Sequence, residues 1–258
     1  MEIFLFNYSN IFSFFLTLIR ISIVVFLLPF YGGRGIPSLV KAVFCIILTI
    51  GIWPNISLKA ESLPTSSIGI FILIFGELIL GIILSLAIKS IFAGVQTAGA
   101  IIGFQMGFSL MNVVDPLSGR STVLTSHLLY MISLLFFLSF NGHLYLISAF
   151  TQSFRLVPPG SILINSQLFD NIIYFTSQIF IIAIKIAAPV MVAELFVSCA
   201  LGVIARLSPQ INVLFVGFPL KIAIGFFFMG IIIEILGFFM RDIVAGLEDI
   251  FNSLMWVG

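Results

Sequence analysis

The sequence predicts an all-α, polytopic protein of the membrane type that is built from helical hairpins. Of its 258 residues, 61% are apolar and 8% are charged, whereas soluble domains carry about 25% charged residues. The mean hydropathy is +1.28, and the apolar residues gather in long windows between turn-forming residues. So few charged side chains cannot coat a soluble globule. A net charge of +1 without a basic block also argues against nucleic-acid binding.

Six apolar windows predict helices. They cover residues 11–30, 39–53, 68–88, 123–140, 174–206 and 213–240. At about 1.5 Å per residue, the second window is shorter than a hydrocarbon core of about 30 Å and the last two are longer. Pro189 can divide the fifth window into two half-helices, and a polar loop is expected before that window. Either tilting and kinking absorb these mismatches, or part of the apolar surface faces protein partners.

Six charged residues fall inside these windows. At the centre of a lipid-exposed helix each would cost about 2.5–3.5 kcal/mol, so we expect them to pair or to face a wet or protein-filled interior. Lys185 and Glu194 are nine residues apart and lie on nearly opposite helix faces, so their partners must come from other helices or chains. A transport relay and ion pairs between helices or subunits both remain open. The six are Arg20, Glu77, Lys185, Glu194, Lys221 and Glu234.

The segment 94–120 is too rich in glycine and polar residues for a lipid-facing span, and too apolar for an exposed loop. Gly99, Gly103 and Gly107 follow one another at a spacing of four. This spacing predicts a helix face without side chains, against which another backbone can pack closely.

Bulky residues accompany this glycine face. Phe104, Phe108 and Met111 form a stripe at helical spacing, and a turn is expected after it. The segment is either a tightly packed helical hairpin or a re-entrant element that lines or plugs a conduit, in which Met and Phe seal against varied surfaces. The turn contains Asp115, Pro116 and Gly119.

Two long motifs then identify a family. The first is GFQMGFS followed by NVVDPLSG, within residues 103–119; the second combines IAAPV at 186–190, RLSPQINV at 206–213 and FVGFPLKI at 215–222. With these motifs the chain resembles the FliR family of flagellar export-gate proteins, called SctT in virulence type III secretion systems. The motif positions that we expect to be structural are Asp115, Pro116, Gly119, Pro189, Arg206, Pro209, Gln210, Asn212, Gly217, Pro219 and Lys221.

The resemblance implies a non-enzymatic subunit without catalytic residues, metal or cofactor. One copy would join several FliP and FliQ subunits in a helical export gate, with FlhB around its base and FlhA nearby. The gate would pass unfolded flagellar proteins across the bacterial inner membrane at the flagellar basal body, and would rise partly above the membrane plane. The resemblance also implies a single domain over residues 1–258.

In this family the hairpin that corresponds to residues 94–120 forms a plug inside the closed gate. The resemblance therefore assigns plug roles to Gly103, Phe104, Met106, Gly107, Phe108, Met111 and Val113.

Two other functions were considered. A secondary transporter or channel would use a helix broken at Pro189 as its substrate site, but the chain has no twofold internal repeat. An intramembrane enzyme finds no support, because His127 and His143 have no partner at zinc-binding spacing and no G-x-S-x-G or P-loop is present. We expect His127 to be a packed helix residue and His143 a loop residue. Lys221 either snorkels to a polar layer or meets an acid on a neighbouring subunit.

Overall fold

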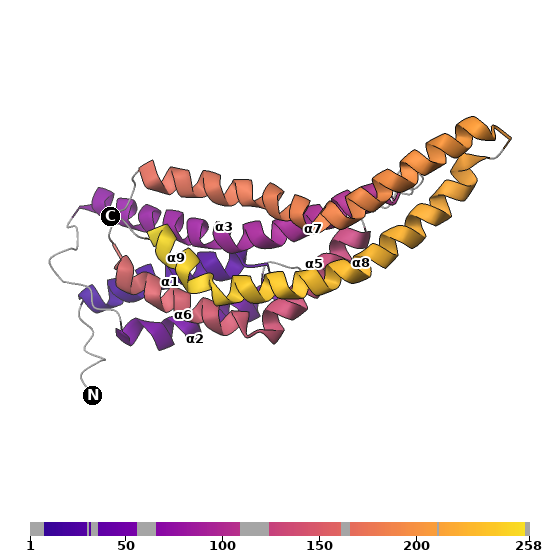
Figure 1. Ribbon diagram of the computed structural model, residues 1–258. Coiled ribbons are helices and arrows are strands. Elements are labelled where there is room, and N and C mark those ends of the chain that lie inside the picture. Colours follow the sequence, from indigo (N-terminus) through magenta and orange to yellow (C-terminus); the bar gives the residue numbers. More distant parts are fainter. Residues whose placement is uncertain are drawn as a thin grey trace. The chain divides into compact units, whose positions relative to one another are not determined.

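The computed structural model describes residues 8–29, 31, 36–55, 66–108, 124–160, 166–210 and 212–255, and these are helical apart from their connections (Figure 1). Within these described residues, four helices are long and apolar enough to cross a membrane, or five if α5 and α6 count as one broken span. The predicted all-α, membrane-type fold is confirmed. The elements are α1 (Tyr8–Leu27), α2 (Ser38–Ile52), the 3-10 turn η1 (Trp53–Asn55), α3 (Ser67–Gln105), α5 (Leu124–Ser139), α6 (Gly142–Leu156), α7 (Ser166–Leu207), α8 (Val213–Ala245) and α9 (Leu247–Met255).

The structure corrects the predicted element boundaries. The third window continues as one helix to Gln105, so the first part of segment 94–120 belongs to α3. The polar loop expected before the fifth window contains α6, and α9 follows the sixth window. Both helices were missed because windows of uniform hydropathy do not detect helices with one apolar and one polar face.

Pro189 does not divide α7, which continues as a single helix from Ser166 to Leu207. A proline inside a helix removes one backbone hydrogen bond and crowds the preceding turn. In transmembrane helices neighbouring groups can compensate for that loss. The two half-helices considered from the sequence are therefore not formed.

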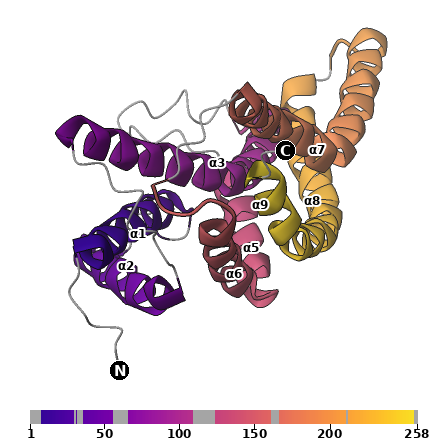
Figure 2. The same ribbon diagram turned by 90° about the vertical axis from the view of Figure 1, so that its left-hand side faces the viewer.

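The chain divides into two compact units. Unit 1 comprises residues 1–90, 141–175 and 245–258, and unit 2 comprises residues 91–140 and 176–244. In unit 1, α1 packs on α2 and α6 packs on α9 (Figure 1 and Figure 2). A core cluster of Ile21, Val25, Cys45, Ile52 and Phe154 joins α1, α2 and α6.

A buried ion pair links the helices of unit 1. Arg20 Nε lies 2.5 Å from Glu77 Oε2, and Nη2 lies 3.0 Å from Oε1. Arg20 Nη1 also donates to the carbonyl of Val157 (2.9 Å), and the N–H of Gly160 donates to Glu77 Oε1 (2.9 Å). For these two charges the expected ion pair between helices is confirmed, and it also holds the chain that leaves α6.

Unit 2 consists of the second half of α3, α5, most of α7 and nearly all of α8. Its core includes Ile102, Met106, Leu129, Val190 and Ile232, all of them fully buried. Beyond this core, α7 and α8 meet at their short connection and form a helical hairpin (Figure 1). We call residues 190–207 of α7 and 213–230 of α8 the α7–α8 arm.

Candidate functional site

The glycine face of α3 brings α5 into close contact. A Cβ atom on Gly99 would lie 2.4 Å from the Cα of Ser126, so only glycine fits at this position. Thr125 Oγ1 donates to the carbonyl of Gly99 (2.6 Å), and Ser126 Oγ donates to that of Gln96 (2.7 Å). The close backbone approach that the glycine spacing predicted is confirmed at Gly99.

Gly107 ends α3 instead of extending the glycine face. Its φ is +85°, in the left-handed region that favours glycine. The N–H of Phe108 donates to the carbonyl of Gly103 (2.9 Å), and the N–H of Gly107 donates to the carbonyl of Phe104 (3.0 Å). These two bonds form a Schellman motif, which satisfies carbonyl groups at the helix end. The end of α3 is therefore defined by its own backbone hydrogen bonds.

The end of α3 is also anchored on α8. Met106 is fully buried, and a Cβ atom on Gly225 would lie 2.4 Å from its Cγ. The ring of Phe108 packs edge-on against that of Phe226, with 6.2 Å between centroids. A Cβ atom on Gly107 would lie 2.7 Å from the ring of Phe218 on α8. Side-chain packing thus holds three consecutive residues of the first motif.

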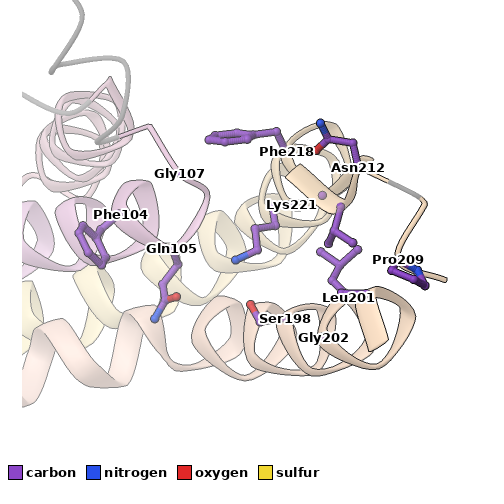
Figure 3. A pocket seen from close by; sticks show the side chains of 13 residues that line it. Phe104, Gln105, Gly107, Ser198, Leu201, Gly202, Pro209, Asn212, Phe218 and Lys221 are labelled. Atoms are coloured by element: carbon purple, nitrogen blue, oxygen red, sulfur yellow. The ribbon is translucent and has the colours of Figure 1, made fainter. Parts of the chain in front are cut away.

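Phe104 differs from these anchored residues, because 68% of its surface is exposed. It lines a pocket of about 900 Å³ between the end of α3 and the α7–α8 arm (Figure 3). Among the described residues of this lining, Lys221 is the only charged one. The lining residues are Phe104, Gln105, Gly107, Ser198, Leu201, Gly202, Ala205, Pro209, Asn212, Val213, Gly217, Phe218 and Lys221.

The pocket joins the two sequence motifs. Phe104 and Gly107 come from the first motif; Pro209, Asn212, Gly217 and Lys221 come from the second. Gln105, Val213 and Phe218 of the lining also belong to these motifs, whereas the other lining residues and the anchor residue Gly225 lie outside them. The available signal for Gly225 was a glycine within a largely apolar helix.

Other expected site residues lie away from the pocket. Pro189 is half-buried within α7, Arg206 is exposed in its last turn, and both Gln210 and Pro219 are exposed. Gly103 is buried in α3. Five expected residues fall outside the described part of the chain: Met111, Val113, Asp115, Pro116 and Gly119.

The histidines occupy other positions than expected. His127 is exposed on α5, and His143 lies in the first turn of α6 and not in a loop. The α5–α6 junction is made by Asn141, whose φ of +59° takes the left-handed conformation. His143 Nδ1 is buried without a hydrogen-bond partner among the described residues.

Comparison with known proteins decides the family. The family model described as "Bacterial export proteins, family 1" matches residues 11–247. Flagellar biosynthetic protein FliR of Escherichia coli (strain K12) is 33% identical over 241 residues, which cover 93% of this chain and 90% of that protein. The chain belongs to the FliR family. FliR of Bacillus subtilis (strain 168) is 34% identical over 95% of this chain and 96% of its own length.

Membership of the FliR family fits the described site. The family consists of bacterial export proteins and is non-enzymatic, so the pocket is not an active site. The transporter alternative required a helix broken at Pro189, and α7 is continuous there.

Proposed function

We propose that this chain is a subunit of the flagellar protein export gate, and that residues 103–113 form its plug. The observation that carries the proposal is the contrast at the end of α3. Met106 is fully buried whereas Phe104 is 68% exposed, so a fixed base presents a free aromatic surface. Such a base suits a seal, which must keep its position while its contact surface adapts to different chains.

The mechanism is steric. Met106 on Gly225 and Phe218 on Gly107 hold the base of the plug, and the Schellman motif ends α3 at this base. Phe104, with Phe108, Met111 and Val113 as expected from the sequence, supplies apolar surface that closes the conduit. An unfolded polypeptide has no fixed shape, and soft, flexible apolar side chains can seal around it.

Partner subunits would cover the exposed apolar helix faces. Leu39, Ile47 and Ile50 on α2 are all more than half exposed. The chain also carries too few charged side chains to make such an apolar surface soluble in water. Exposed apolar patches of this kind mark protein or membrane contacts. We assign these contacts to FliP, FliQ and FlhB, with FlhA nearby, in a gate at the flagellar basal body of the inner membrane that holds one copy of this chain. The arm presents further exposed residues: Val192, Leu195, Phe196, Val203, Leu207, Phe215 and Val216.

The test uses the complete gate, co-expressed with its partner subunits. In Phe104→Ala the gate should assemble in normal amounts but leak ions or small solutes, because the exposed ring contributes to the seal and not to the core. The matched control is Phe71→Ala on the same helix, since Phe71 is 69% exposed. Membrane permeability of cells containing each gate is measured. Normal permeability of an assembled Phe104→Ala gate would overturn the plug role of this ring.

A further inference from the structure

Glu194 is a buried acid that lacks a hydrogen-bond partner. Its side chain is 0% exposed in α7, and neither carboxylate oxygen has a hydrogen-bond partner within the described part of the chain. A buried charge without a partner is strongly unfavourable, and it is tolerated when a counter-charge and hydrogen bonds compensate. The ionised form of Glu194 therefore requires a counter-charge.

Lys221 on α8 is a described cation that interacts electrostatically with Glu194, although the two side chains form no hydrogen bond with each other. Its side chain extends into the pocket, with the ammonium nitrogen on the side of Gln105 and Ser198 (Figure 3). Ser198 lies four residues after Glu194 in α7, so both project from the same helix face. Lys221 thus extends toward the part of α7 that carries the buried acid.

The other charges of α7 and α8 are less suited to this role. The cations Lys185 and Arg206 on α7 and Arg241 on α8 are exposed, and the remaining charged residues, Asp170, Glu234 and Asp242, are exposed acids. Lys185 is nine residues from Glu194, which places it near the opposite face of the same helix. Lys221 is half-buried on α8, and a lysine side chain carries its ammonium group on a flexible four-carbon stem.

We propose that Glu194 and Lys221 form a charge pair across the α7–α8 arm, with Glu194 as a positioning residue for Lys221. The pair holds the two helices of the arm in register. It also fixes the ammonium group at one side of the pocket and cancels its charge, which leaves a pocket suited to uncharged, apolar contacts. This role is independent of the plug proposal, since it concerns the arm within one chain.

Charge reversal in the complete gate tests the pair. Glu194→Lys and Lys221→Glu should each reduce the amount of assembled gate by about tenfold or more, because each buries two like charges. The double variant Glu194→Lys/Lys221→Glu should restore assembly to within about twofold of the original chain. If the two residues contributed by packing alone, exchanging their charges would not restore gate assembly.

A second double variant is the matched control for rescue. Glu194→Lys/Lys185→Glu has the same composition of charges, but residue 185 lies on the other side of α7, so assembly should stay low. If this control rescues as well as the exchange with residue 221, the assignment of Lys221 is wrong.

Neutral variants keep the test informative when reversals prevent folding. Lys221→Met leaves Glu194 without its counter-charge, so it should reduce assembly more than Glu194→Leu/Lys221→Met, in which an apolar pair replaces the charges. If Lys221 instead met an acid on another subunit, the double variant would be no better than Lys221→Met, and Glu194→Leu alone would have no effect. That result would overturn the proposal.

Discussion

Met106 fills the space that the missing side chain of Gly225 leaves on α8. A Cβ atom at residue 225 would lie 2.4 Å from Cγ, 2.7 Å from Sδ and 2.8 Å from Cε of Met106, which is fully buried. The contact therefore depends on glycine at one position and on a large, flexible side chain at the other. It fixes the end of α3 against α8 where the first family motif begins.

Gly225→Ala should destabilise unit 2 by about 1–3 kcal/mol, because the new methyl group overpacks the core around Met106. The control is Gly230→Ala on the same helix, where nothing lies within 4 Å of the new Cβ; it should stabilise the helix by about 0.4–1 kcal/mol. Thermal unfolding of the purified gate distinguishes the two glycine variants.

Met106→Ala in the Gly225→Ala background should recover part of the stability that Gly225→Ala loses. Equal stability of Gly225→Ala and Gly230→Ala would refute the contact between Met106 and Gly225.

Gly99→Ala should be more damaging and should have no side-chain rescue. Its Cβ would meet the Cα of Ser126 at 2.4 Å, and backbone cannot rotate away as the end of a side chain can. Moving α5 would also lengthen the bond from Thr125 Oγ1 to the Gly99 carbonyl. We expect a loss above the roughly 1–3 kcal/mol of ordinary overpacking, measured as accumulation of the chain in membranes. Gly51→Ala, with open space around it, should accumulate normally.

Removing one partner of the Arg20–Glu77 pair should cost about 3–5 kcal/mol, because the remaining charge is buried without compensation. Arg20→Met also frees the carbonyl of Val157, which accepts from the guanidinium at 2.9 Å. The double variant Arg20→Met/Glu77→Leu should be more stable than Arg20→Met alone. Thermal unfolding of the three chains in the gate measures this, and additive losses would contradict a paired role.

Asn141→Val should destabilise the junction of α5 and α6 by about 1–2 kcal/mol, since a β-branched side chain is poorly tolerated at φ +59°. Asn141→Gly should be close to neutral, because glycine adopts this conformation without strain. The two variants are compared by their resistance to added protease in isolated membranes. Similar resistance would show that the left-handed conformation is not required there.

The fold class was accessible from the sequence because it follows from local composition. Long apolar windows and few charged residues predict membrane-type helices, whatever the tertiary arrangement of those helices. The six windows all fall on helices. Element boundaries were less accessible. Nothing in the local hydropathy shows that α3 continues to Gln105, and α6 buries only one face, including Leu146 and Phe150.

The helical, low-charge character of this protein, its two family motifs and the glycine spacing that lets α5 approach Gly99 can all be recognised in the amino-acid sequence. The pairing of Arg20 with Glu77, the packing of Met106 on Gly225 and the meeting of the two motifs at one pocket became visible in the folded chain. The difference lies in the distance along the chain between the residues in contact. Helix periodicity relates residues within a few turns, whereas these contacts depend on how helices from separate parts of the sequence pack together.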